Sequence, residues 1–174
     1  DKFVTTSINK KGTTSVDNEF LKSMEDWRKS LAINIALRND SLNEDEMNYT
    51  VQQTIDRLIF LRICEDRKIE PYGTLKSFLD SVSIYETLFQ YFQKADDKYN
   101  SGLFDFKKDK LTQNLIIDNK ILKSIITEMY YPACPYEFSV IPVEILGNSY
   151  EQFLGSVIRL TSGHHAKVEI KPEV

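Results

Sequence analysis

Residues 58–64 form the sequence LIFLRIC, in which Arg62 is the only polar residue. A helix that is apolar on all sides belongs inside a core, whereas a surface helix keeps a polar face. Asn43, followed three positions later by Glu46, has the pattern of a capping box and marks the start of this helix. The helix should end before Pro71, because proline rarely continues a helix. The sequence therefore predicts one long central helix.

Outward from this stretch, four other segments repeat apolar residues at helical spacing. Asp17 and Ser83 are placed to open two of them, since each side chain can accept a bond from a free amide of the first turn. Asp118 and Pro142 are placed to open the other two. The four predicted helices cover about 17–39, 83–99, 118–131 and 142–160.

The segment 103–118 has the weakest helical pattern. It contains FDF, a lysine-rich turn and LIID, so two short paired strands that form a β-hairpin and an ordered loop both fit it. The last predicted helix rests on an apolar seam at helical spacing. The seam consists of Leu146, Tyr150, Phe153, Val157 and Leu160.

The whole chain has 174 residues, of which 41% are hydrophobic and 28% are charged, and its formal net charge is −4. Chains of this length usually form one domain, and the 6 glycines are too few for a turn-rich barrel. The negative charge is unlike that of a free-standing nucleic-acid binder. No run of about 18 apolar residues is present, so no membrane partner is expected. We therefore expect a mainly α fold, a single compact helical bundle of about five main helices.

The densest charged cluster falls on the predicted central helix. It consists of Asp56, Arg57, Arg62, Glu65, Asp66 and Arg67. Arg62 and Asp66 are four positions apart, a spacing that brings opposite charges together on a helix. A catalytic or phosphate-binding patch is one interpretation. A structural charge network is favoured, because an unpaired buried charge costs several kcal/mol.

A metal-dependent nuclease core needs two carboxylates that bind Mg²⁺ and a lysine that polarises the attacking water. Only the part with one carboxylate followed two positions later by a lysine occurs. It is found at Asp105 and Lys107 and in two similar tripeptides that start at Asp96 and Glu169. A minimal nuclease around Asp105 and Lys107 is therefore a weak hypothesis.

The remaining metal and thiol candidates are weak as well. His164 and His165 are adjacent, and neighbours in sequence rarely bind one metal ion without further ligands. Cys64 and Cys134 are isolated, which is typical of thiols in a reducing compartment, so a cytoplasmic protein is expected. These patterns predict no catalytic, cofactor-binding or metal-binding residue.

Five long phrases of the sequence, taken together, carry a family resemblance. They are SVDNEFLKSMEDWRKSLAINIALRN (15–39), VQQTIDRLIFLRICEDRKIEPYGTL (51–75), DDKYNSGLFDF (96–106), YYPACPYEFSVIPVEILGNSYEQFLG (130–155) and HHAKVEIKPEV (164–174). In this order they strongly resemble the helical connector of bacterial type IIG restriction–modification enzymes. In that family one chain carries an endonuclease domain, a helical spacer, an N6-adenine DNA methyltransferase and a DNA target-recognition region.

The resemblance implies an architectural role. The family's Asn-Pro-Pro-Tyr motif, which positions the target adenine, is missing, since no Asn precedes a Pro here. The complete carboxylate–lysine set of its nuclease is missing as well. It implies a lead-in over 1–16 from an upstream nuclease domain, a connector domain over 17–160 and a tail over 161–174 leading into a methyltransferase domain. For the parent chain it implies DNA as a partner, flanking domains, and S-adenosylmethionine and Mg²⁺ as cofactors. It implies no cofactor in this segment.

We therefore expect a non-catalytic helical spacer that orients the nuclease and the methyltransferase with its recognition region. The alternative is a module that binds the DNA backbone, because phosphate-binding surfaces are built from lysine and arginine. Its candidate contacts are Lys107, Lys108, Arg159 and Lys167. The minimal metal-dependent nuclease is the weaker alternative.

Overall fold

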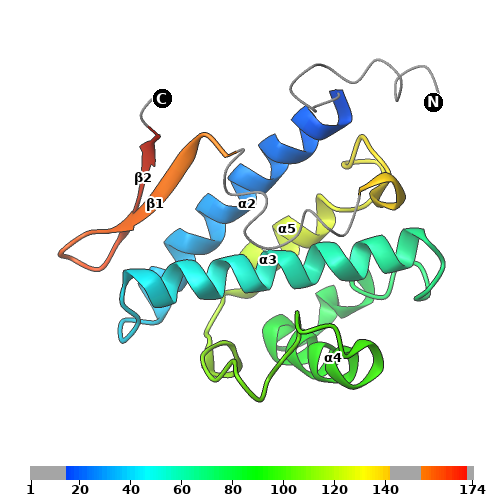
Figure 1. The fold of residues 1–174 in the computed structure, drawn as a ribbon, viewed down its shortest axis with the longest axis horizontal. Coiled ribbons are helices and arrows are strands. Elements are labelled where there is room, and N and C mark those ends of the chain that lie inside the picture. Colours follow the sequence, from blue (N-terminus) through cyan, green and yellow to red (C-terminus); the bar gives the residue numbers. More distant parts are fainter. Residues whose placement is uncertain (1–14, 142–153, 172–174) are drawn as a thin grey trace.

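A computed structural model describes residues 15–141 and 154–171 of the chain. Within these ranges the chain forms four α-helices, α2 to α5, and one two-stranded antiparallel sheet. The helix α3 runs through the middle, with α2 above it and α4 below it (Figure 1). The predicted mainly α fold is confirmed, and a short β-hairpin is present, although it lies at 156–170 and not at 103–118. The predicted division into 1–16, 17–160 and 161–174 stays a prediction.

The first helix, α2, spans Ser15–Arg38 and buries the apolar stripe of its sequence. The stripe consists of Phe20, Met24, Trp27, Leu31 and Ile35, each at most 2% exposed. Asp17 lies inside the helix, so it is not the N-cap residue that we predicted. At the other end, the Asn39 side chain donates to the Ile35 carbonyl (2.9 Å) just after the helix stops.

The central helix, α3, spans Glu44–Asp66 and confirms the prediction from LIFLRIC. Asn43 accepts a hydrogen bond from the Glu46 amide (2.8 Å), and the Glu46 carboxylate accepts one from the Asn43 amide (3.0 Å). The predicted capping box is therefore present. Every residue from 54 to 59 is buried. Because a turn contains 3.6 residues, the helix is enclosed on all sides there.

The next helix, α4, spans Ile84–Tyr99 and follows a short 3-10 helix, Lys76–Asp80. Ser83 accepts a hydrogen bond from the Glu86 amide (3.4 Å) and caps the start, as predicted. Asn100 adopts the left-handed conformation, with φ of 48°, and ends the helix. The buried residues of the helix are Ile84, Tyr85, Leu88, Phe92 and Ala95.

The segment 103–118 is an ordered loop that contains a short 3-10 helix, Thr112–Asn114. The loop alternative is therefore correct, and the β-hairpin considered for this place is wrong. The backbone of the segment bonds to distant side chains instead of to a second strand. The Leu103 carbonyl accepts from Arg57 (2.9 Å), and the Ile116 amide donates to Asn39 (2.8 Å).

The helix α5 spans Asn119–Thr127, with Asp118 at its N-cap position as predicted. The Asp118 carboxylate does not cap its own helix. It accepts instead from Asn34 (2.8 Å) and Arg38 (3.1 Å), which both lie on α2. The chain then continues through turns and a short 3-10 helix, Phe138–Val140.

The last described segment is a β-hairpin, with β1 at Ser156–Leu160 and β2 at Ala166–Ile170. The predicted final helix is therefore wrong for residues 156–160. Its first part, 142–153, lies outside the described residues, with Pro142, Leu146, Tyr150 and Phe153. The spacing of Val157 and Leu160 fits a helix, but pairing with 166–170 selects a strand. The described residues accordingly contain four α-helices and not five.

The hairpin packs across α2 and the first turn of α3 (Figure 1). Two α3 side chains bond to the outer edge of β1. Asn48 donates to the Ile158 carbonyl (3.0 Å), and Glu44 accepts from the Leu160 amide (2.7 Å). Ile158 is 3% exposed and is the buried residue of β1. Polar bonds and the apolar contacts of Ile158, Leu160 and Ala166 thus fasten the hairpin to the helical body.

Replacing Asn43 with Ala removes the side-chain acceptor that caps α3. We expect the free energy of unfolding to fall by about 1 kcal/mol, measured by urea denaturation. Gln93→Ala, at an exposed position of α4, is the control and should change it by less than about 0.5 kcal/mol. Equal stabilities for the two variants would show that the capping box does not stabilise the fold.

Candidate functional site

Arg57 of α3 is 1% exposed and joins the central helix to the loop that follows α4. Its Nη2 donates to Asp109 Oδ2 (2.7 Å), its Nη1 donates to Thr112 Oγ1 (3.0 Å), and its Nε donates to the Leu103 carbonyl (2.9 Å). The guanidinium also lies over the Phe106 ring, 4.6 Å from its centroid. Each nitrogen of the guanidinium therefore already bonds to a protein acceptor.

Asp109 is the buried partner of this arginine. Its Oδ1 accepts from the amides of Leu111 (3.0 Å) and Thr112 (3.1 Å). Burial alone would raise the pKa of the carboxyl. The hydrogen bonds from Thr112 and Arg57 outweigh burial and hold the pKa below its usual value. The Asp109 carboxylate is therefore ionised at neutral pH.

Arg62, one and a half turns further along α3, is 3% exposed and forms a second buried pair. Its two Nη atoms donate to the two carboxylate oxygens of Asp66 at 2.9 and 3.1 Å. Its Nε donates to the Met129 carbonyl (2.9 Å), and its guanidinium lies 4.3 Å from the centroid of the Tyr130 ring. Asp66 Oδ2 also accepts from the Phe138 amide (2.8 Å). The arginine and its carboxylate thus hold the turns after α5 against α3.

Glu65 extends this second cluster. Its carboxylate accepts from the Tyr130 hydroxyl (2.6 Å) and from the amides of Gly73 (2.8 Å) and Leu75 (3.1 Å). Burial and the hydrogen bond to Glu65 raise the pKa of Tyr130, so the phenol stays protonated. The turn after α3 and the turn after α5 are therefore tied to the same carboxylate.

The remaining two residues of the predicted cluster are Asp56, in α3, and Arg67, at its C-cap. Asp56 is fully buried and accepts from Gln52 (2.8 Å). Arg67 is exposed at the end of α3 and donates to the carbonyls of Ser139 (3.3 Å) and Ile141 (3.0 Å). The six predicted residues therefore share one helix but take part in separate sets of contacts.

The sequence patterns do not indicate the partners that complete both clusters. These are Asp109, Thr112, Met129 and Tyr130. Asp109 is 52 positions away from Arg57, and Met129 is 67 positions away from Arg62. Two arginines on an otherwise apolar helix indicate that buried partners exist, because an unpaired buried charge is too costly. No local pattern indicates which residues they are.

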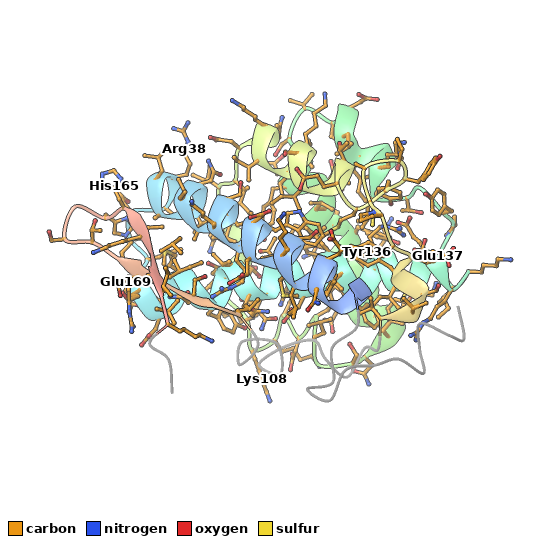
Figure 2. The ribbon with its side chains drawn as sticks, turned by 90° about the horizontal axis from the view of Figure 1, so that it is seen from above. Arg38, Lys108, Tyr136, Glu137, His165 and Glu169 are labelled. Carbon is orange, nitrogen blue, oxygen red and sulfur yellow. The ribbon has the colours of Figure 1, made fainter. Side chains whose placement is uncertain are left out.

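The four basic residues proposed for DNA contacts lie in two places. Lys107 and Lys108 are exposed on the loop after α4, and Figure 2 shows Lys108 pointing away from the body of the protein. Arg159 and Lys167 are register partners across the hairpin. Both lie 3.5 Å from Glu169. The hairpin cations therefore have a carboxylate neighbour, whereas the two lysines form no ion pair with any described residue.

The Asp105 and Lys107 pair lies within one turn of that loop. Asp105 Oδ1 accepts from the Lys107 amide (3.2 Å), so the carboxylate contributes to the local turn. Among residues 15–141 and 154–171, no group of three or more His, Cys, Asp or Glu side chains is placed to bind a metal ion.

A surface hollow of about 410 Å³ lies beside the Arg62 cluster. Tyr72, Tyr131, Tyr136 and Cys134 contribute to its lining. Burial raises the pKa of the Cys134 thiol, which keeps it protonated and a poor nucleophile. Arg62 and Asp66 also line the hollow and are already paired with each other.

The described residues thus define a mainly helical region with two buried charge clusters and a docked hairpin. No described helix is long and apolar enough to cross a membrane. The sequence is similar to part of a type II restriction enzyme and methyltransferase. This similarity supports the resemblance to a region of a type IIG restriction–modification enzyme.

That relative is RM.Eco57I of Escherichia coli, to which the chain is 39% identical over 160 residues. The match covers 91% of this chain, but the chain spans only 16% of the length of the relative. No family model matches the chain, and no solved structure matches it.

Replacing Arg57 with Met leaves the Asp109 carboxylate buried without its counter-ion. We expect a loss of about 3–5 kcal/mol in the free energy of unfolding, measured by chemical denaturation. Arg159→Met removes two exposed ion pairs, with Glu44 and with Glu169, and should cost less than about 1 kcal/mol. A similar small loss for both variants would contradict a stabilising role of the buried pair.

The lowered pKa of Asp109 predicts a defined pH dependence. The unfolded carboxyl binds a proton below about pH 4, whereas the folded one resists protonation. The stabilisation is therefore complete above that pH and is lost on acidification. We expect the stability difference between the wild type and Asp109→Asn to shrink from pH 7 to pH 3 in denaturation series. The exposed Asp97→Asn variant is the control, and a constant difference for Asp109→Asn would refute the assignment.

Proposed function

We propose that this chain is the helical spacer of a bifunctional restriction–modification enzyme that methylates adenine in DNA and cleaves DNA. The observation that supports it best is the 39% identity to a protein named both restriction enzyme and methyltransferase, across 91% of this chain. The chain spans 16% of that relative, so most of such an enzyme lies outside the spacer. The spacer orients the nuclease relative to the methyltransferase and recognition modules and carries out no reaction itself.

The contacts of α3 support this role, because a spacer must be stiff. A flexible linker spreads its end-to-end distance over a wide range, and cleavage at a fixed offset from a recognised site requires one distance. Arg57 ties α3 to the loop after α4, and Arg62 ties it to the turns after α5. Asn34 and Arg38 tie α2 to the start of α5. Charged side chains thus lock the irregular segments onto the helices.

The surface charge fits a spacer that leaves DNA binding to its neighbours. The chain carries a formal charge of −4, which weakens non-specific attraction to phosphate. The parent enzyme would act on DNA in the cytoplasm and use S-adenosylmethionine and Mg²⁺. In this proposal the residues that bind these groups belong to the flanking domains.

The first test uses the isolated chain. We expect no heat of binding with S-adenosylmethionine in calorimetry and no nicking of plasmid DNA with Mg²⁺. The second test uses the complete parent enzyme with Asp109→Asn, a milder change than Arg57→Met, and with Arg159→Met as control. Loosening the buried cluster should spread the cleavage positions over neighbouring base pairs while methylation of a short duplex continues. Methyl transfer or DNA cleavage by the isolated chain would overturn the proposal.

Lys107 and Lys108 favour one alternative, because they are exposed and form no ion pair with a described residue. A module that contacts the DNA backbone loses affinity steeply as salt increases. Duplex binding by the isolated chain with a steep salt slope would support that module. Replacing Lys107, Lys108, Arg159 and Lys167 with Ala should then flatten the slope. A nicking activity that Lys107→Ala abolishes would support the minimal nuclease instead.

A further inference from the structure

The hairpin turn inserts one histidine ring between two backbone carbonyls of the helical body. His164 lies in this turn with φ of 65° and is partly buried. Its Nδ1 lies 2.8 Å from the carbonyl oxygen of Ala36, in the last turn of α2. Its Nε2 lies 2.7 Å from the carbonyl oxygen of Leu42, in the connection between α2 and α3. One ring therefore bridges the last turn of α2 and the connection that leads to α3.

The two contacts define the protonation state of the ring. A carbonyl oxygen only accepts hydrogen bonds, and a neutral imidazole has a single N–H. Both contacts are hydrogen bonds only when His164 is an imidazolium that donates from both nitrogens. The carbonyls of the last helical turn also carry partial negative charge and favour a cation. The neutral ring would place a nitrogen lone pair against a carbonyl oxygen.

The charged groups around the ring favour the same state. The hydrogen bonds to the Leu42 and Ala36 carbonyls raise the pKa of His164, and the negative charge of Asp40 adds to this, while burial opposes it. Arg38, at the end of α2, is paired with Asp118.

Two further titratable groups are sequence neighbours of the ring or of its partners, since Glu44 is two positions after Leu42 and His165 follows His164. Glu44, in the first turn of α3, bonds to the hairpin through the Leu160 amide. His165 is the neighbour in the turn and is exposed, and Figure 2 shows it near Arg38 at the end of α2. His165 therefore serves as an internal reference for an exposed histidine.

We propose that His164 is a proton-controlled latch that holds the β1–β2 hairpin on the connection between α2 and α3. The imidazolium donates one N–H to Ala36 and the other to Leu42. Loss of one proton to solvent breaks one of these bonds and weakens the docking. The latch depends only on the fold. Under the proposed function it would also make the orientation of the hairpin on the spacer sensitive to pH.

The direction of the pH effect follows from the raised pKa. The contribution of the latch is complete below the unfolded value of about 6.5. It is lost as the pH rises through the higher pKa of the folded state. Docking should therefore be tightest in mildly acidic solution and looser in alkaline solution.

The direct test is NMR of the ring nitrogens in the chain labelled with ¹⁵N-histidine. We expect both nitrogens of His164 to keep imidazolium chemical shifts above about pH 6.5, the usual pKa of a histidine. A neutral His164 ring at about pH 6 would overturn the latch.

The functional test measures hydrogen exchange, corrected for the intrinsic pH dependence of exchange. The Leu160 amide donates to Glu44 on α3, so its protection reports docking of the hairpin. The Thr161 amide donates to the His165 carbonyl, so its protection reports closure of the hairpin itself. His164→Gln should lower Leu160 protection roughly two- to fivefold at about pH 5.5 and change it little at about pH 8.5. Thr161 should keep its protection, and His165→Gln, the control, should behave like the wild type.

Two results of that experiment would contradict the latch. The first is Leu160 protection in His164→Gln that equals the wild-type value at low pH. The second is an equal loss at Leu160 and Thr161, which would mean that the hairpin melts instead of undocking.

Discussion

The burial of two guanidinium groups on one helix is the constraint on which the rest of this structure depends. The helix α3 is enclosed by apolar neighbours, yet it carries Arg57 and Arg62 at 1% and 3% exposure. A buried cation without partners would cost several kcal/mol, which is a large share of the stability of a domain of this size. The surrounding chain must therefore bring carboxylates and carbonyls to these two positions. The loop after α4 supplies Asp109, and the turns after α5 supply the Met129 carbonyl.

This constraint explains why the irregular segments are ordered. The loop after α4 has no strand partner and no long helix, but its Leu103 carbonyl and its Asp109 side chain both bond to Arg57. Glu65 orders the turn after α3 in the same way, because its carboxylate accepts hydrogen bonds from two backbone amides of that turn. Long side chains on a rigid helix thus replace the regular hydrogen bonds that a sheet or a helix would supply. A body locked in this way can keep a fixed distance between the modules at its two ends, which is what the proposed spacer role requires.

The hairpin is fastened by a different kind of contact. Ile158 is its buried residue on β1, and Leu160 and Ala166 also pack against the core. The polar contacts that fasten the hairpin include those of Glu44, Asn48 and the ring of His164. Apolar burial changes little with pH, whereas the bonds of a histidine ring depend on its protonation. The helical body and the hairpin therefore respond to different conditions. In a spacer, the stiff body would keep the length fixed, and the docking of the hairpin would change with pH.

The sequence by itself determined the helices α2, α3 and α4 and most of their buried residues, because periodic apolar spacing and N-cap residues such as Asn43 and Ser83 act within one or two turns. It also indicated that the arginines of α3 need partners. Only the tertiary structure decided what those partners are, because Asp109 and Met129 lie 52 and 67 positions away from them. The same reason applies to Asp118, whose position predicts a cap but whose carboxylate bonds to α2. It applies also to residues 156–160, where spacing fits a helix and pairing with a later strand overrides it. Local patterns describe contacts between near neighbours, and these features depend on contacts that form only after the chain has folded.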